Sequence, residues 1–204
     1  MIRAFLAVQL SEPLRTTLAA LQSEVKRRII HDLRREVSLS WVRPASMHLT
    51  VKFLGDIPDE LVIPLRDAIA GALKGHHVLH IPLDRLGVFP ALQQPRILWI
   101  GPTEQWEASD DAGRLAALHQ AIEACCSALN LAADTRPLSA HLTLARIKAG
   151  HRAAGQTLAR SGVMDRLPSV VGSIPVERIT LMRSELKPTG SVYTALWEAK
   201  LQAE

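Results

Sequence analysis

Two short segments of this 204-residue chain carry the same histidine and threonine at the same spacing. His48-Leu49-Thr50-Val51 follows Arg43-Pro44, and His141-Leu142-Thr143-Leu144 follows Arg136-Pro137, 93 residues later. Over the nine positions that begin at these arginines, six are identical. A repeat of this quality predicts two halves built on one plan, each bringing the same chemical groups to a shared place.

The alternation of side chains along a β-strand decides what each copy presents. In the first copy the apolar residues point to one face and His48 and Thr50 to the other. The second copy places His141 and Thr143 in the same way, so each half offers an imidazole beside a hydroxyl. The alternative is an exposed strand in which histidine and threonine are merely tolerated, and a matched second copy disfavours it.

Paired imidazoles suit the in-line cleavage of a phosphodiester. Histidine titrates near neutral pH, so one neutral ring can take a proton from attacking water while the other, protonated, gives a proton to the leaving oxygen. The two oxygens lie on opposite sides of phosphorus, and histidines on opposite walls of a cleft match them. Thr50 and Thr143 can donate hydrogen bonds to the non-bridging oxygens, so neither a metal nor a cofactor is expected.

Competing chemistries leave little trace in the sequence. It contains no glycine-rich phosphate loop ending in Gly-Lys-Ser/Thr, no His-Glu-x-x-His and no Gly-x-Ser-x-Gly. None of the lysines begins a Lys-x-Asp-Gly, which disfavours an ATP-driven ligase of the adenylating type. His76, His77 and His80 could suggest a metal site, but without a nearby cysteine or carboxylate they favour a solvent-facing strand edge.

Composition indicates a folded protein outside the membrane. Apolar residues make up 48% of the chain, and no run approaches the roughly 18 uncharged apolar residues of a membrane helix. The two cysteines, Cys125 and Cys126, are adjacent and cannot form an ordinary disulfide with each other. We expect a cytoplasmic monomer. The 18 arginines against 6 lysines suit a phosphate-bearing partner, although a GC-rich genome would give the same ratio.

The elements that position the motifs are read from periodicity and turn residues. Strands are expected at 1–9, 38–42, 47–54, 78–89, 96–101, 138–147, 178–186 and 192–201. Helices are expected at 11–29, 58–73, 115–129 and, weakly, 150–167, with a polar connector at 106–113. Gly55-Asp56 should end the third strand, and Pro64 should delay or kink the second helix. This order favours an α+β protein with antiparallel sheets.

Several arginines lie on the outer faces of the first helix and its C-terminal extension, namely Arg27, Arg28, Arg34 and Arg35. They could follow an RNA backbone. Glu24 and Asp32 lie at helical spacing from Arg28 and Arg35, so a solvated, ion-paired face is the favoured interpretation.

With both motifs in view, the chain resembles the two-histidine phosphoesterases, which are defined by paired His-x-Thr-x motifs. Within that superfamily it is most similar to bacterial and archaeal RNA 2',3'-cyclic phosphodiesterases, also called 2'-5' RNA ligase-like proteins. The likeness covers most of the chain and is weakest at 150–175. Besides the motifs it includes Arg3-Ala4-Phe5, Gly87-Val88-Phe89-Pro90, Arg96-Ile97-Leu98-Trp99, Ser184-Glu185-Leu186, Gly190 and Tyr193.

The resemblance implies a single domain over residues 1–204 with two lobes, each an antiparallel sheet backed by helices, and the motifs facing across a central cleft. It implies hydrolysis of an RNA or nucleotide 2',3'-cyclic phosphate to a 2'-phosphate by cleavage of the bond to O3'. It makes His48 the general acid and His141 the general base; the residues alone do not distinguish these roles.

Two cationic residues near the motifs are ambiguous. Arg146 matches a family arginine that approaches the phosphate, yet strict alternation puts it on the packed face of its strand. Either the strand ends or bulges near Ala145, or Arg146 is structural. Lys52 shares a face with His48 on the same reasoning, and it could add positive charge to the cleft or protect an edge strand.

Three aromatic residues are candidates for contact with the substrate. Phe5, Phe89 and Tyr193 could stack on a base of the substrate, or they could belong to the core.

A protein of the same fold could bind RNA ends as a sensor without cleaving them, which intact histidines and threonines in both motifs disfavour. ATP-independent ligation of RNA ends is a further alternative, and hydrolysis is favoured because water is abundant.

Overall fold

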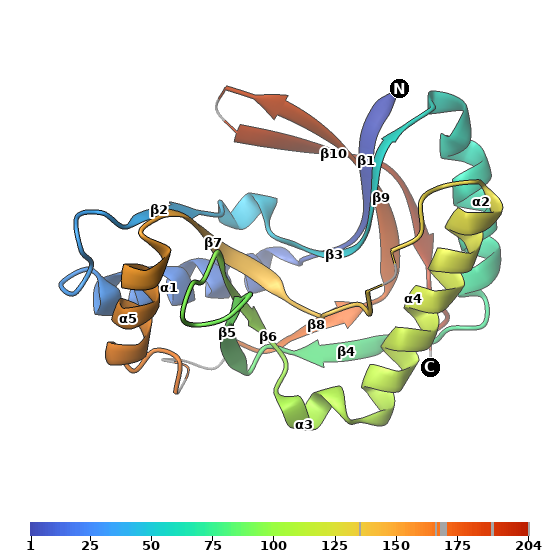
Figure 1. Ribbon diagram of the computed structural model, residues 1–204. Coiled ribbons are helices and arrows are strands. Elements are labelled where there is room, and N and C mark those ends of the chain that lie inside the picture. Colours follow the sequence, from blue (N-terminus) through green and yellow to red (C-terminus); the bar gives the residue numbers. More distant parts are fainter. Residues whose placement is uncertain (135, 166, 168–170, 189, 204) are drawn as a thin grey trace.

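The computed structural model describes residues 1–134, 136–165, 167, 171–188 and 190–203 (Figure 1). The strands are β1 (Ile2–Gln9), β2 (Ser38–Trp41), β3 (His48–Ile57), β4 (Leu79–Pro82), β5 (Arg85–Phe89), β6 (Ile97–Gly101), β7 (Leu142–Ala149), β8 (Ser173–Val176), β9 (Arg178–Lys187) and β10 (Gly190–Lys200). The α-helices are α1 (Glu12–Ile29), α2 (Val62–Leu73), α3 (Glu104–Glu107), α4 (Asp110–Ala128) and α5 (His151–Arg160). Short 3-10 turns are η1 (Pro44–Ser46) and η2 (Asp59–Leu61).

Within these residues the strands form two four-stranded sheets and one smaller pair. The first sheet has the order β10-β9-β1-β3, the second has the order β2-β7-β6-β5, and β4 pairs with β8. All of the strand pairs in these sheets are antiparallel. The predicted α+β class with antiparallel sheets is therefore confirmed.

Each half of the chain contributes a strand, a helix and a motif strand: β1–α1–β3 in the first half and β6–α4–β7 in the second. The helices cross over. In Figure 1, α1 lies with α5 at the second sheet, and α4 lies with α2 at the first. Two contacts document the crossing, because Gln22 of α1 hydrogen-bonds to β7 and Glu123 of α4 pairs with Lys52 of β3. Each lobe is thus a sheet backed by helices, as predicted.

Helix α1 forms where the sequence predicts it. The hydroxyl of Ser11 accepts a hydrogen bond from the backbone N–H of Leu14 at 3.5 Å, which satisfies one of the free donors of the first turn. The buried stripe recurs at spacings of three or four and consists of Leu14, Leu18, Leu21, Gln22, Val25 and Ile29. The polar Gln22 is the one member of this stripe that a hydrophobic pattern does not explain.

The structure corrects three expectations about elements. The segment 78–89 is not one strand: Leu83 N donates to Gly172 O and Asp84 N to Gly101 O, so the chain turns from one sheet to another between β4 and β5. The segment 106–113 is not a connector, because Ser109 caps α4. Gly55 does not end β3; it has a φ of 73° and lies opposite Ala4 next to a bulge.

The structure also shows the outcome of the predictions for Pro64, for the segment 150–175 and for His80. Pro64 lies in the first turn of α2, where its missing N–H would have no helical acceptor, so it delays the start of the helix. Helix α5 falls within the segment 150–167, where a weak helix was expected, and strand β8 begins within the segment 150–175, where the likeness is weakest. His80 is exposed opposite Pro175, in line with a strand edge.

Metal-binding clusters and membrane-spanning helices are both absent from the described residues. No three His, Cys, Asp or Glu side chains among them are grouped so that they could hold a metal ion. Nor is any helix in the described part of the chain both long and apolar enough to cross a membrane.

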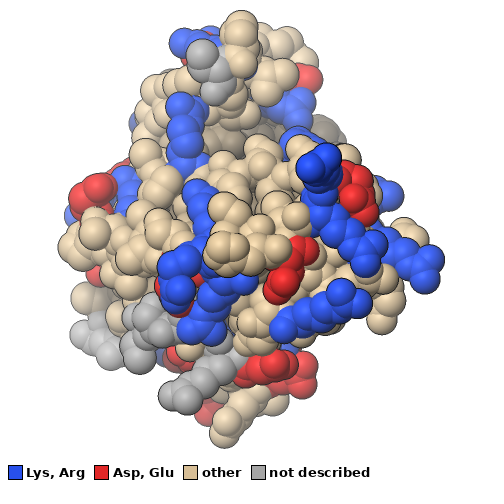
Figure 2. Space-filling model, turned by 90° about the vertical axis from the view of Figure 1, so that its left-hand side faces the viewer, with Lys and Arg blue, Asp and Glu red and all other residues tan. Residues whose placement is uncertain are grey.

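Lysine and arginine are prominent on the end of the molecule that carries β2 and α5 (Figure 2). The arginines of α1 are ion-paired as expected: Glu24 lies 2.7 Å from Arg27 and 2.9 Å from Arg28. These two guanidinium groups lower the pKa of Glu24 to about 2. The expected Asp32–Arg35 pair is not found among the described residues, so the prediction holds for the helix and not for its extension.

Candidate active site

The two motifs lie in different sheets and are brought together by the segment that precedes the first. Trp41 at the end of β2 lies opposite Ala145 of β7, and Val42 N donates to Leu144 O at 2.9 Å. The turn η1 then carries the chain into the first sheet, where His48 begins β3. Strands β3 and β7 contact each other. His48 is the first residue of β3 and His141 directly precedes β7, so the two histidines lie at the starts of strands that contact each other.

Both imidazoles are oriented by the same local contact. His48 Nδ1 lies 2.9 Å from Ser46 O, and His141 Nδ1 lies 2.8 Å from Ser139 O. A carbonyl oxygen only accepts hydrogen bonds, so Nδ1 carries a hydrogen in each ring and Nε2 is left for chemistry. The two serines occupy equivalent positions in the repeat. Both copies therefore hold the histidine in the same tautomer, with the hydrogen on Nδ1.

Each histidine is held between aromatic rings. The ring of His48 lies 4.7 Å from that of Phe5 and 5.1 Å from that of Tyr193. The ring of His141 lies 5.0 Å from that of Phe89. The three aromatic residues singled out from the sequence are thus all at the histidines. Phe5 is only 3% exposed, so its main contact is with the protein, and base stacking stays a prediction for all three.

Trp99 is a member of this site that sequence reasoning missed. Its ring lies 6.3 Å from that of His141 and 5.2 Å from that of Phe89. It lies directly opposite Gly87, and a Cβ at that position would overlap the indole. A glycine inside an otherwise apolar strand was the available signal, because it marks the close approach of another group.

A β-bulge follows the threonine in each motif. The pairing of β1 with β3 passes from Ala7–Thr50 to Leu6–Lys52, which leaves Val51 without a partner. The pairing of β6 with β7 leaves Leu144 without one in the same way. An extra residue reverses the alternation beyond it.

The bulge in β7 resolves the position of Arg146. Ala145 is buried and Arg146 is exposed, so the guanidinium lies on the side of Thr143 and not in the core. In β3 the same reversal buries Lys52, which is 3% exposed. Lys52 therefore does not share a face with His48, and both interpretations offered for it are wrong.

The two motif strands, β3 and β7, differ in the exposed residue that follows the bulge. Phe53 is the counterpart of Arg146 in the repeat, and it is 67% exposed with its ring 6.0 Å from that of Phe5. At this position β7 therefore presents a cation, Arg146, and β3 presents an aromatic ring, Phe53. The half-buried hydroxyls of Thr50 and Thr143 have no hydrogen-bond partner within the described part of the chain, which leaves both able to donate.

A polar side chain from the helix of the other half, Gln22 or Glu123, braces each bulge. Gln22 Nε2 donates to Leu144 O at 2.8 Å and to Val42 O at 2.9 Å. Lys52 Nζ donates to the carboxylate of Glu123 and to Ala132 O, each at 2.8 Å. Each brace thus ties one motif strand to the segment that leads into the other motif, which couples their positions.

The electrostatic environment is shared by the two histidines. Burial lowers the pKa of His48 and of His141, and the positive charge of Arg146 lowers both further. The hydrogen bonds to Ser46 O and Ser139 O act in the opposite direction. A single guanidinium within electrostatic reach of both rings is consistent with one site made from two halves.

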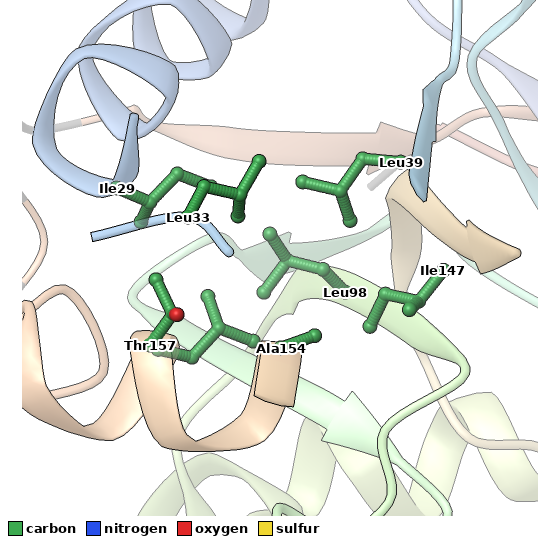
Figure 3. Close-up of a pocket in the computed structure, with 8 residues that line it drawn as sticks. Ile29, Leu33, Leu39, Leu98, Ile147, Ala154 and Thr157 are labelled. Carbon is green, nitrogen blue, oxygen red and sulfur yellow. The ribbon is translucent and has the colours of Figure 1, made fainter. Parts of the chain in front are cut away.

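A small apolar crevice lies elsewhere in the second lobe (Figure 3). Figure 3 shows its side chains converging from α1, the segment after it, β2, β6, β7 and α5: Ile29, Leu33, Leu39, Leu98, Ile147, Ala154, Thr157 and Leu158. Its free volume of about 10 Å³ admits one water-sized sphere at most. It is a packing defect of the core and cannot hold a nucleotide.

Sequence comparisons agree with this architecture. A model of the family described as LigT like Phosphoesterase matches residues 8–99. A Thermus thermophilus protein named RNA 2',3'-cyclic phosphodiesterase is 32% identical over 216 residues, which cover 100% of this chain and 92% of the relative. A protein of the same name from Methanothermobacter thermautotrophicus is 28% identical over 193 residues, 95% of each chain.

Solved structures share the fold. The crystal structure of the Thermus thermophilus protein TT0787 aligns with a TM-score of 0.71 at 28% identity and covers 99% of both chains. The crystal structure of E. coli LigT complexed with NADP+ aligns with a TM-score of 0.67 at 20% identity and covers 98% of both. The predicted two-lobed fold is confirmed by these neighbours.

Proposed function

The chain belongs to the LigT-like phosphoesterase family, and from this premise we propose that it hydrolyses the 2',3'-cyclic phosphate of RNA ends or nucleotides. The observation that carries the proposal is the pair of imidazoles, each held through Nδ1 by an equivalent serine carbonyl. Paired acid and base groups with free Nε2 atoms are what an in-line displacement at phosphorus requires. The names of the relatives point to the same reaction.

The proposed step balances as a hydrolysis. A water oxygen forms a bond to phosphorus while the bond from phosphorus to O3' breaks, which leaves the phosphate on O2'. His141 takes the proton of the water and His48 gives a proton to O3', following the family's assignment of base and acid. The two rings then exchange their protonation states and solvent restores them.

Three further groups stabilise the charge that develops on the phosphoryl oxygens. Thr50 and Thr143 have free hydroxyls on the motif strands and donate to the non-bridging oxygens. Arg146 supplies a permanent positive charge within reach of both histidines. Because protons are moved by imidazoles and charge is met by these donors, the proposed reaction needs no metal and no cofactor.

The site also bears on the state of the protein. Each motif strand is braced by the helix of the other half, so we propose that residues 1–204 act as one domain and as a monomer. The cysteines are free thiols, with Cys126 buried, which is compatible with the expected cytoplasmic location.

The test is incubation of the protein with cytidine 2',3'-cyclic phosphate in EDTA, with the product identified by phosphorus NMR. We expect turnover to cytidine 2'-phosphate at the same rate with and without the chelator. The absence of turnover, or its loss in EDTA, would overturn the metal-free reaction. Formation of the 3'-phosphate would overturn the assignment of O3' as leaving group.

A substrate with sulfur in place of O3' tests the roles of the histidines. A thiolate leaves without a proton, so the loss caused by His48→Ala should be much smaller on this substrate than on the oxygen compound. The loss caused by His141→Ala should be the same on both. The reverse pattern would exchange the acid and the base.

A further inference from the structure

The surface beyond Arg146 continues as a row of exposed polar groups. Along β7, Arg146 and Lys148 are exposed and alternate with buried Ala145 and Ile147, so both cations point to the side of Thr143. The edge strand β2 runs beside them, with exposed Ser40 opposite Arg146. Cations and hydroxyls thus extend from the histidines toward the end of β7.

The cations of this row are not neutralised by the protein. Several arginines elsewhere are held by carboxylates at 3.1 Å or less, among them Arg27 with Glu24, Arg85 with Glu104, Arg136 with Asp134 and Arg183 with Glu185. Among the described residues neither Arg146 nor Lys148 has an acidic partner within 4.0 Å, which is the limit for an ion pair. Figure 2 shows lysine and arginine prevailing over acidic side chains on this end of the molecule.

The row leads into an open hollow at the end of β7. The hollow measures about 370 Å³ and is lined by Glu36, Gln94, Gly150, His151, Arg152 and Ala153. Arg152 is exposed there, and the single carboxylate, Glu36, lies 4.0 Å from Arg34. The surface past the site is therefore open and polar, so an extended chain meets no barrier.

The chemistry of the substrate determines where a chain must go. In a 2',3'-cyclic phosphate both O2' and O3' of the ribose are bonded to the cyclic phosphate, so an RNA strand continues only through O5'. The phosphate of that linkage is one nucleotide away from the reacting one. Two residues of β-strand advance about 7 Å, which is of the order of the spacing between successive phosphates in an extended strand.

We infer that the row Arg146–Lys148, flanked by Ser40, is a subsite for the RNA chain on the 5' side of the cyclic phosphate. The inference rests on the proposed function and deepens it: the preferred substrate is an oligonucleotide and not a mononucleotide. Arg146 serves the reacting phosphate, and Lys148 contacts the phosphodiester that precedes it. Lysine is suited to this contact as a point charge on a flexible stem.

A length series tests the subsite. The value of kcat/KM is measured for cytidine 2',3'-cyclic phosphate, which has no 5' phosphate, and for di-, tetra- and decanucleotides that end in it. We expect Lys148→Ala to leave the mononucleotide unchanged and to lower the oligonucleotide values about three- to tenfold from the dinucleotide onward. The dependence of log KM on log salt for the decanucleotide should lose about one unit of slope.

Lys200→Ala is the matched control, because Lys200 is an exposed lysine on β10 and its loss changes the net charge equally. We expect it to leave all four substrates unaffected. Equal losses on mononucleotide and oligonucleotides, an unchanged oligonucleotide rate in Lys148→Ala, or the same loss in Lys200→Ala would each overturn the subsite. A wild-type protein that cleaves none of the substrates would instead overturn the proposed function.

Discussion

Gln22 of α1 and Glu123 of α4 make corresponding contacts with the two motif strands. Each reaches from the helix of one half to the bulge in the motif strand of the other, Gln22 to Leu144 O and Glu123 to the ammonium of Lys52. The bulges beside the motif residues need support, because an unpaired residue loosens the hydrogen-bonded ladder. The two halves meet this need with different chemistry, an amide in one and an ion pair in the other.

Gln22→Leu should destabilise the protein and disturb the second motif. The variant keeps the size of the side chain but leaves the partly buried Val42 carbonyl without the donor that Gln22 provides, which costs about 1–3 kcal/mol. Urea unfolding followed by circular dichroism measures the loss. Ser23→Ala, on the exposed face of the same helix, is the control and should change stability by no more than about 0.5 kcal/mol.

Lys52→Met should be more damaging than the loss of Gln22. The lysine side chain is 1% exposed and Glu123 is 16% exposed, so the variant leaves a largely buried carboxylate with its main partner gone. A loss of about 3–5 kcal/mol is expected. The double variant Lys52→Met with Glu123→Gln should recover part of it. If the double variant lost the sum of both single effects, the ion pair would not be the reason.

His48→Ala and His141→Ala should each reduce kcat by at least about 10²–10⁴-fold on cytidine 2',3'-cyclic phosphate, because each removes a group proposed as general acid or base. Neither side chain fills the core, so the thermal midpoint should change little. His80→Ala, which removes an exposed histidine of β4, should retain the full rate. A wild-type rate in either motif variant would contradict the two-imidazole scheme.

Arg146→Met should move the pH profile to higher pH. The guanidinium lowers the pKa of both His48 and His141, so its removal raises both values in the free enzyme. Both limbs of the bell-shaped kcat/KM profile should therefore shift in the same direction, with a lower maximum because the phosphate loses the cationic partner proposed for it. NMR titration of the imidazoles gives an independent measure. Unchanged pKa values would place Arg146 out of reach of the rings.

Much of this site was predictable because its main parts are local. The repeat identifies His48, Thr50, His141 and Thr143 by residue type and spacing, and alternation predicts that each histidine shares a face with its threonine. What alternation cannot predict is an inserted residue. A bulge depends on the partner strand. The burial of Lys52 was therefore seen only in the structure, and the sequence left open which face of its strand Arg146 occupies.

Long-range partners account for the other differences. The segment 78–89 has one continuous strand pattern, yet β4 pairs with β8 and β5 with β6, a division that arises from distant segments. Trp99 was visible as an apolar residue, but its place beside His141 follows from the glycine across the ladder. Local patterns therefore identified the motifs, and tertiary pairing decided their surroundings.

The crossing of α1 and α4 has a consequence for folding. Each helix covers the sheet to which the other half contributes its motif strand, so neither half has an apolar core that it can close alone. The two halves should consequently unfold together, in one transition with coincident midpoints for tryptophan fluorescence and circular dichroism. A chain cut between β5 and β6 should give two fragments that are unstructured apart and regain structure on mixing.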